Sequence, residues 1–295
     1  MRVCSGLIVF FIGLVSYSIA SDPLTIHKSI QEVRLTVVAT DVHGRPVSSL
    51  QAQEVAVIED GHRINHFDLR PASDLPLRVA VVLDLSWSMR ESWPAVRGSL
   101  GQTLDRMLLP EDQLLVIAFD NKIEVEKTLN DVRELTPLEL PRPGGLTALY
   151  DTVFLACREE VLNDPGEARH SAVILFSDGE DNLSRHDLQD DIESAESAGI
   201  AVYTIASHSR QVHRSGDAIL QELASSTGGR AFVVENAAEL ENALSTIQSE
   251  LRSSYLLYYR TDDNSGGRHF RRVSLVPTRQ DGPSLRSREG YYTSH

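Results

Sequence analysis

Three oxygen-bearing side chains, Asp84, Ser86 and Ser88, stand at alternate positions directly after an apolar run. One carboxylate and two hydroxyls on a tight loop supply hard oxygen donors, which suit Mg²⁺ better than zinc or copper. Because the hydroxyls are neutral, such an ion keeps charge to spare and can hold a water or an incoming carboxylate in an open position. The spacing therefore predicts a divalent-metal site. The alternative is that both serines only cap the helix that follows them.

Two further segments offer oxygen donors of the same kind. In the segment 143–151, PGGLTALYD, two glycines permit a tight turn and Thr147 stands where a helix is expected to begin. In the segment 176–181, FSDGED, an apolar run ends just before Asp178. With one added water or ligand oxygen, five such donors approach octahedral coordination. The candidate metal ligands are Asp84, Ser86, Ser88, Thr147 and Asp178.

The elements that must position these loops alternate between strands and helices. Apolar runs predict strands at 78–83, 113–119, 171–176, 200–206 and 230–234, with a short edge strand at 124–129. Helical periodicity predicts helices at 90–108, 148–162, 187–198, 217–225 and 237–252. This alternation indicates an α/β fold, a doubly wound and mostly parallel sheet with helices on both faces. In such folds ligands bind at the carboxyl ends of the strands, where Asp84 and Asp178 lie.

The flanking segments have a different pattern. Residues 30–70 alternate with period two between Gly and Asp turns, and strands are again expected at 255–261, 269–276 and 285–292. Neither flank is large enough to form a core alone. We therefore expect an N-terminal β segment (21–75) and a C-terminal β segment (254–295) to pack as one small all-β sandwich, into which the α/β unit (76–253) is inserted.

Residues 1–20 have the order of a secretory signal peptide: one basic residue, an apolar core and small residues before a polar stretch. We expect cleavage after Ala20 and export to the periplasm or the exterior; a retained N-terminal anchor is the alternative. No second apolar stretch is long enough to span a membrane. The mature chain keeps one cysteine, Cys157, so no internal disulfide forms, and its helical apolar surroundings predict a buried, inert thiol.

Net charge argues against one class of partner. The chain carries a formal charge of −14 and has a pI of about 5.1. Nucleic-acid binding requires a basic face for the phosphates, so a nucleic-acid partner is not expected. The local basic run Arg268, Arg271 and Arg272 lies on an expected strand and is interpreted as an exposed face.

The three donor segments, in this order on alternating strands and helices, resemble the von Willebrand factor type A domain over residues 77–253. In that family they form the metal-ion-dependent adhesion site. The resemblance implies that Ser86, Ser88 and Thr147 bind Mg²⁺ through their hydroxyls, with Mn²⁺ or Ca²⁺ as substitutes. It implies that Asp84 and Asp178 bind directly or through water, and that a ligand carboxylate completes the shell.

The flanks resemble a narrower group, bacterial exported proteins related to the von Willebrand factor type A domain. The similar stretches are Asp41-x-x-Gly44-Arg45-Pro46-Val47, the Glu59-Asp60-Gly61 turn and Arg288-x-Gly290-Tyr291-Tyr292. This resemblance implies a fold and a site but no named ligand.

The function that we expect is an exported, non-enzymatic, Mg²⁺-dependent module that binds an Asp or Glu carboxylate of a partner protein. One alternative is a structural subunit of a cell-envelope assembly, in which the ion only stabilises the loops. The other is a Mg²⁺-dependent phosphoester hydrolase, which is disfavoured because no general base with a clear partner accompanies the site.

Several residues near the candidate site allow two interpretations. Trp87 either shapes the rim of the metal site or packs on a neighbouring loop. Glu180 and Asp181 either tune the metal loop or are solvated loop acids, and Glu91 serves either the ion or the helix dipole. The histidines, including His208 and His213, lack partners at metal-ligand spacing and are expected on the surface.

Overall fold

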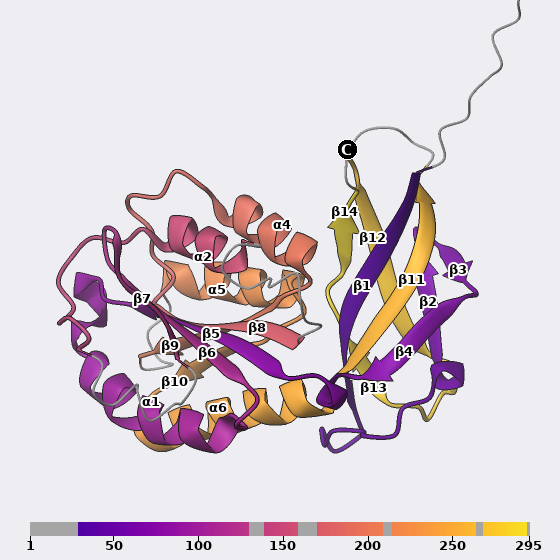
Figure 1. Ribbon diagram of the computed structural model, residues 1–295, viewed down its shortest axis with the longest axis horizontal. Helices are drawn as coiled ribbons and strands as arrows, with labels where there is room; N and C mark the ends of the chain where they lie inside the picture. Colours follow the sequence, from indigo (N-terminus) through magenta and orange to yellow (C-terminus); the bar gives the residue numbers. More distant parts are fainter. Residues whose placement is uncertain (1–28, 130–138, 159–169, 209–213, 264–267, 294–295) are drawn as a thin grey trace, which may run out of the picture.

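The chain forms an α/β unit and a β-sandwich that lie side by side (Figure 1). The computed structural model describes residues 29–129, 139–158, 170–208, 214–263 and 268–293. The expected signal peptide at 1–20 lies outside the described residues. The helix expected at 148–162 ends at Cys157, where the backbone of Arg158 becomes extended, and residues 159–162 lie outside the described residues. Within the described part of the chain, no helix is long and apolar enough to cross a membrane.

The α/β unit is built on a six-stranded sheet. Its strands are β5 (Leu77–Asp84), β6 (Gln113–Phe119), β7 (Ile123–Leu129), β8 (His170–Phe176), β9 (Ala201–Ser207) and β10 (Ala231–Val234). Their order is β10-β9-β8-β5-β6-β7, and only the edge strand β7 pairs antiparallel. The predicted mostly parallel sheet is confirmed, with β5 and β8, the two strands that precede the candidate aspartates, as direct neighbours.

Helices cover both faces of this sheet, as Figure 1 shows. Side chains of a strand point alternately to its two faces. In β5, Val79 and Val81 face α1 (Trp93–Met107) and α6 (Ala237–Ser253). Ala80 and Val82 face α2 (Leu149–Cys157), α4 (Leu188–Ala198) and α5 (Ser215–Ser226). All four residues are fully buried, which is why the run is apolar without interruption.

The β-sandwich consists of two four-stranded sheets, ordered β13-β1-β11-β4 and β14-β12-β2-β3. The N-terminal segment supplies β1 (Ser29–Thr40), β2 (Val55–Glu59), β3 (His62–Ile64) and β4 (Phe67–Pro71). The C-terminal segment supplies β11 (Tyr255–Asp263), β12 (Phe270–Pro277), β13 (Ser284–Arg286) and β14 (Gly290–Tyr292). β1 pairs antiparallel with β11 along nine residue pairs, so the two ends of the chain share one core. The expected fold class, an α/β unit inserted in a small β-sandwich, is confirmed.

Two arginines, one of them buried, fix the sandwich against the α/β unit. Arg288 is 8% exposed and donates to the backbone carbonyl of Glu196 on α4 and to that of Arg34 on β1. Arg286 donates to the carbonyl of Gly228 and pairs with Glu250 on α6. A charged side chain is rarely buried without such partners. The Arg288 motif that was recognised in the sequence is therefore a contact between the two units.

Three other expected elements differ from the structure. The helix expected at 90–108 is preceded by a 3₁₀ turn, η3 (Trp87–Arg90), and α1 begins only at Trp93 with a proline in its first turn, where a missing N–H costs nothing. α5 begins at Ser215, two residues earlier than expected. The strand expected at 285–292 is instead β13 and β14, which belong to different sheets because Arg288 turns toward the α/β unit between them.

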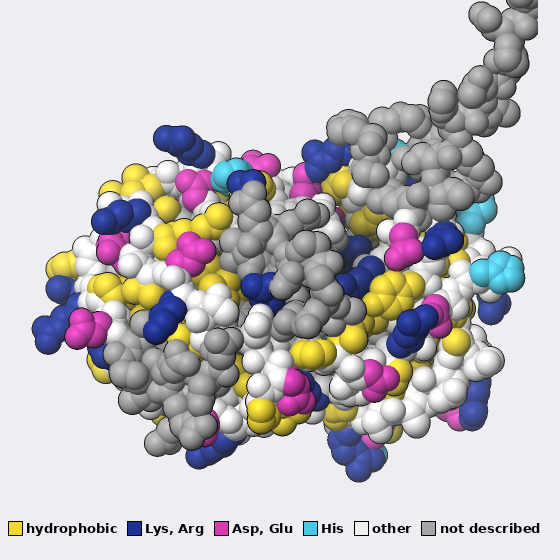
Figure 2. All heavy atoms as spheres, in the orientation of Figure 1, with side chains coloured by type: hydrophobic (Ala, Val, Ile, Leu, Met, Phe, Trp, Pro, Cys, Tyr) yellow, Lys and Arg dark blue, Asp and Glu magenta, His cyan; other side chains and the backbone are white. Residues whose placement is uncertain are grey.

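The basic run on β12 is not simply an exposed face. Arg271 is 14% exposed at its side chain and pairs with the buried carboxylate of Glu59 at 2.8 Å. Glu59 also accepts hydrogen bonds from the hydroxyls of Tyr259, Thr261 and Tyr291. The interpretation of this run as exposed is therefore wrong for Arg271, which holds the sandwich core together. On the face drawn in Figure 2, basic and acidic side chains of the described residues are interspersed over both units.

Candidate metal centre

Asp84 and Ser177 lie side by side because β5 and β8 are parallel neighbours. In their register Leu83 pairs with Phe176, so both strands end at the same level of the sheet. Asp84 is the last residue of β5, Ser177 and Asp178 follow β8 directly, and all three are at most 3% exposed. The carboxyl edge of the sheet thus carries two buried carboxylates from separate strands.

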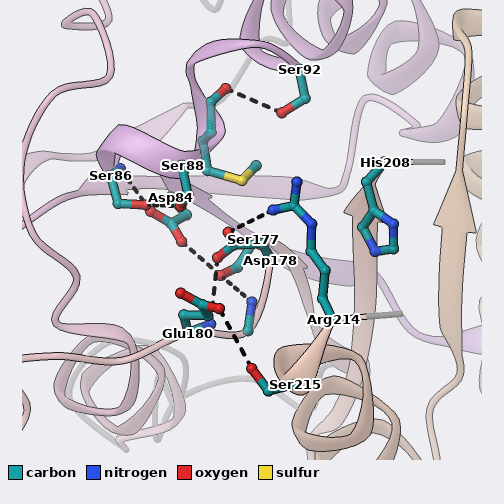
Figure 3. A network of polar contacts seen from close by, with 12 residues as sticks. Asp84, Ser86, Ser88, Ser92, Ser177, Asp178, Glu180, His208, Arg214 and Ser215 are labelled. Carbon is teal, nitrogen blue, oxygen red and sulfur yellow. Dashed lines mark hydrogen bonds and ion pairs between the residues drawn. The ribbon is translucent and has the colours of Figure 1, made fainter. Parts of the chain in front are cut away.

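Hydrogen bonds hold both carboxylate oxygens of Asp84 (Figure 3). The backbone N–H of Ser86 donates to Oδ1 at 2.8 Å, and the hydroxyl of Ser177 donates to Oδ2 at 2.6 Å. The Ser177 oxygen in turn accepts from the backbone N–H of Gly179 at 3.0 Å. Ser177 therefore couples the two aspartate loops and fixes the orientation of Asp84.

Burial, with a smaller contribution from the nearby Asp178 carboxylate, raises the pKa of Asp84 to about 6, although the hydrogen bonds from Ser177 and Ser86 act in the opposite direction. A carboxylate that is costly to ionise in isolation gains from a cation beside it. The electrostatics of Asp84 therefore favour a bound positive charge at this edge of the sheet.

Ser86 and Ser88 face each other, with 3.1 Å between their hydroxyl oxygens. Ser86 occupies the N-cap position of η3, but its side chain makes no capping hydrogen bond. The capping alternative is therefore wrong for Ser86. The two hydroxyls and Asp84 form one group of oxygens on the first loop, as Figure 3 shows.

The glycine loop that carries Thr147 packs against the first loop. The N–H of Trp87 donates to the carbonyl of Gly145 at 2.9 Å, and the N–H of Gly144 donates to the carbonyl of Leu85 at 2.8 Å. A Cβ on Gly145 would lie 2.3 Å from a carboxylate oxygen of Asp120, so only glycine fits there.

Thr147 also contacts the third loop through its backbone. It is 3% exposed, and its carbonyl accepts from the N–H groups of Asn182 at 3.0 Å and Leu183 at 3.1 Å. Thr147 thus lies between the loop of Ser86 and the loop of Asp178.

Asp178 has a partner that the sequence did not reveal. Its Oδ2 accepts from Nη1 of Arg214 at 3.1 Å, and its Oδ1 accepts from the N–H of Glu180 at 3.4 Å. Arg214 immediately precedes α5, and no motif around it signalled a role at the site. Only the packing of the start of α5 against the loop after β8 brings it to the metal site.

The donor set fits a small oxygen-seeking cation. The five candidate ligands offer two buried carboxylates and three neutral hydroxyls, and such oxygens are the ligands that Mg²⁺ takes in proteins. Among the described residues, no group of three or more His, Cys, Asp and Glu side chains could hold a metal ion. A site here therefore depends on the hydroxyls of Ser86, Ser88 and Thr147 as much as on the carboxylates.

Exposed apolar side chains border the centre. Trp87 is 62% exposed, and the Arg90 guanidinium lies over its ring at 3.9 Å. Arg90 also donates to the carbonyl of Pro143 on the glycine loop at 3.2 Å. Leu146 on that loop is 56% exposed. The Trp87 ring therefore packs against the Arg90 guanidinium and remains largely exposed at the rim of the centre.

The remaining candidates have structural contacts. Asp181 accepts from the N–H of Leu149 at 2.8 Å, so it stabilises the start of α2. Glu180 accepts from the hydroxyl of Ser215 at 3.5 Å, whereas Glu91 is exposed after η3. His208 is buried and pairs with Asp217 at 2.7 Å, so its expected surface position is wrong. His213 lies outside the described residues.

Cys157 is buried, with a free thiol whose pKa is raised by burial. The thiol therefore stays protonated and unreactive, as expected.

Comparison with protein families gives one match. The model of the von Willebrand factor type A domain matches residues 79–246, which is more than half of the chain and includes all five candidate ligands. A comparison with curated protein sequences finds no match.

Comparison with solved structures gives several similar chains. BatB from Bacteroides thetaiotaomicron is 21% identical, with a TM-score of 0.47 over 59% of this chain and 98% of that chain. Proximal thread matrix protein 1 from the mussel byssus is 16% identical, with a TM-score of 0.50 over 76% of this chain and 51% of that chain. A further structure of the mussel protein, 17% identical with a TM-score of 0.50 over 67% of this chain and 50% of that chain, is described with a zinc-occupied metal-ion-dependent adhesion motif. At these identities the likeness concerns the fold.

Proposed function

Since this chain belongs to the von Willebrand factor type A domain family, we propose that it is an exported, Mg²⁺-dependent module that binds an Asp or Glu carboxylate of a partner protein. The observation that supports this most is the buried Asp84, held on both oxygens and surrounded by hydroxyls and a second carboxylate at the carboxyl edge of the sheet. Such an edge is where α/β folds bind ligands.

In this proposal each residue of the centre has a separate task. Asp84 and Asp178 neutralise the ion, while Ser86, Ser88 and Thr147 bind it through neutral hydroxyls. Ser177 stays outside the ligand set and orients Asp84. When bound, the ion supplies an open coordination position for a carboxylate. The neutral hydroxyls keep the ion electrophilic enough to attract that carboxylate.

The rim supplies the rest of the affinity. Capture of one carboxylate by one ion is orientationally specific but modest, so neighbouring contacts must add to it. Trp87 and Leu146 are exposed beside the centre, and aromatic side chains are frequent energetic anchors of protein interfaces. We therefore expect Trp87 to pack against the partner residue that flanks the carboxylate.

The experiment uses the mature chain, residues 21–295, immobilised and offered an array of peptides that each contain a single Asp or Glu. Peptides with Asn or Gln at that position are the matched ligands. Binding is expected in Mg²⁺, lost in EDTA and lost in Asp178→Ala, whereas Asp281→Ala, which removes an exposed aspartate of the sandwich, should keep it. Equal capture of the amide peptides, or capture in EDTA, would contradict the proposal.

A second variant separates the ion from the rim. Trp87→Ala is expected to weaken capture of the peptides while the affinity for Mg²⁺ stays within about twofold, because the indole lies outside the ligand set. Parallel titrations with Mn²⁺, Ca²⁺ and Zn²⁺ identify the preferred ion. A loss of Mg²⁺ affinity in Trp87→Ala would show that the residue acts on the metal loop.

Aspartate variants of the mature chain also test the two alternative functions, a structural subunit and a phosphoester hydrolase. A structural subunit would lose thermal stability without the ion but keep its partner in Asp178→Ala. A phosphoester hydrolase would show turnover on phosphoester substrates that Asp84→Ala abolishes. The geometry supports binding better than catalysis, since Asp84 is hydrogen-bonded on both oxygens and Asp178 pairs with Arg214, which leaves neither carboxylate placed as a general base.

A further inference from the structure

A fixed positive charge of the chain itself contacts the candidate centre. Nη1 of Arg214 lies 3.1 Å from Oδ2 of Asp178, and Figure 3 shows the guanidinium directed into the group of Asp84, Ser177 and Asp178. The Asp178 side chain is 4% exposed and that of Arg214 is 34% exposed. The pair is thus buried on the carboxylate side and open to solvent on the arginine side.

The backbone of Arg214 is held in place by its own contacts. Its N–H donates to Oδ2 of Asp217 at 3.2 Å, and Oδ1 of Asp217 pairs with Nε2 of His208 at 2.7 Å. The His208 side chain is 4% exposed at the end of β9. The start of α5 is therefore anchored to the sheet, and Arg214 does not reach Asp178 from a free loop.

The backbone at the start of α5 also contacts the backbone of the Asp178 loop directly. A Cβ on Gly216 would lie 1.9 Å from the carbonyl oxygen of Asp178, and a Cβ on Gly179 would lie 2.4 Å from the carbonyl oxygen of Gly216. Gly179 has a φ of +79°, a conformation that favours glycine. Any larger residue at either position would push the start of α5 away from the aspartate loop. The chain thus places Arg214 beside Asp178 by close packing on both sides.

The Arg214 guanidinium and a divalent ion would compete for the Asp178 carboxylate. Each needs a carboxylate oxygen, and each is a cation that disfavours the other at short range. Oδ2 of Asp178 already accepts from Arg214, and Oδ1 accepts from the N–H of Glu180 at 3.4 Å, so an ion that binds Asp178 comes close to the guanidinium. A metal ion that takes Oδ2 must displace the guanidinium or share the oxygen with it.

We propose that Arg214 is a built-in competitor of the divalent ion: it neutralises Asp178 in the metal-free protein and thereby sets the affinity of the site for metal. This inference rests on the proposed metal site. In this proposal the centre has two states: the Arg214 guanidinium neutralises Asp178 in one, and the metal ion neutralises it in the other. In the metal-free state Arg214 offsets the repulsion between Asp84 and Asp178.

The test is Arg214→Gln in the mature chain, with two measurements of opposite expected sign. Calorimetric titration should give an affinity for Mg²⁺ and for Mn²⁺ that is higher by about threefold to tenfold, because the competitor is gone. Thermal denaturation without metal should give a lower melting temperature than the wild type, because two neighbouring carboxylates have lost their counter-charge. The rise in melting temperature on adding Mg²⁺ should therefore be larger in the variant.

Two further variants serve as controls. Arg214→Lys keeps the charge and should stay close to the wild type in both measurements. Arg185→Gln makes the same change in net charge at an exposed arginine whose backbone, not its side chain, contacts Asp151, and it should change the affinity for Mg²⁺ by less than twofold. Circular dichroism confirms that each variant is folded.

The outcomes separate this inference from the proposed function. If the wild type binds Mg²⁺ and Arg214→Gln binds it equally or more weakly, the competition is wrong and the metal site stands. If Arg214→Gln binds Mg²⁺ and the wild type does not, the competition holds in its strongest form. If none of the proteins binds Mg²⁺ or Mn²⁺, both proposals are overturned.

Discussion

Ser177→Ala removes one oxygen atom next to the candidate centre without removing a proposed ligand. In the wild type that hydroxyl donates to Oδ2 of Asp84 at 2.6 Å and accepts from the N–H of Gly179 at 3.0 Å. The substitution therefore leaves Oδ2 of Asp84 without the Ser177 hydrogen bond, while Oδ1 keeps that from the N–H of Ser86. We expect weaker Mg²⁺ binding with an altered dependence on pH.

The magnitude follows from the hydrogen bond. A hydrogen bond to a charged group contributes about 1.5–3 kcal/mol, and about 1.4 kcal/mol corresponds to one pKa unit. The pKa of Asp84, raised by burial to about 6 in the wild type, should therefore rise by a further one to two units or so in the variant. At pH 7 a proton then competes with the ion and weakens binding by about twofold to tenfold. Loss of orientation adds to this, since outer-shell substitutions cost about 10–100-fold in metal affinity.

The assay is calorimetric titration of Mg²⁺ at several pH values between 6 and 9. The wild type should reach its full affinity near pH 7, whereas Ser177→Ala should still gain affinity between pH 7 and pH 9, because only above its higher pKa is Asp84 fully ionised. Ser225→Ala is the matched control, since this exposed serine donates its hydroxyl to carbonyls of its own helix, α5. Identical affinities and pH profiles for the wild type and Ser177→Ala would refute this account of Ser177.

Two more substitutions test how buried carboxylates affect the stability of the fold. Burial raises the pKa of Glu196 to about 7, although the charge of Arg288 acts in the opposite direction. Because this pKa is higher than the ordinary value of 4.5, the contribution of protonated Glu196 to stability is present below about pH 4.5 and is lost as the pH rises through 7. Glu196→Gln, which mimics the protonated form, should therefore raise the free energy of unfolding by about 1–3 kcal/mol at pH 8 and leave it unchanged near pH 4; equal effects at both pH values would contradict this. Asp112→Ala should lower that free energy by about 3–5 kcal/mol, because the buried carboxylate accepts from the N–H of Leu77 at the start of β5 and pairs with Arg252. Urea denaturation measures both effects, and a loss below about 1 kcal/mol in Asp112→Ala would show that the pair adds little.

The sheet of the α/β unit could be predicted because its central strands are buried on both faces. Uninterrupted apolar runs such as that of β5 have few other interpretations, and the aspartates at their ends mark the carboxyl edge. The same argument predicted that the Asp84 and Asp178 loops meet, because parallel neighbours end at one edge. The insertion in a β-sandwich followed from the inability of either flank to close a core.

Long-range pairs of charged residues could not be predicted. Arg271 and Glu59 are brought together by the pairing of β12 with β2, two strands from opposite ends of the chain. Arg214 meets Asp178 because two glycines let α5 approach the aspartate loop, a contact that no spacing in the sequence encodes. The prediction of one strand at 285–292 was wrong for the same reason, since Arg288 bonds Glu196 of the α/β unit and Arg34 on β1 of the sandwich.

The most direct test of the central claim is calorimetric titration of Mg²⁺ into the metal-free mature chain and into Asp178→Ala, with and without a peptide that carries one glutamate. The account predicts a single saturable site in the wild type, tighter binding when the carboxylate is present, and no saturable binding in Asp178→Ala. Saturable binding of equal affinity in both proteins, or no binding in the wild type and in Arg214→Gln alike, would contradict a metal centre built on Asp84 and Asp178.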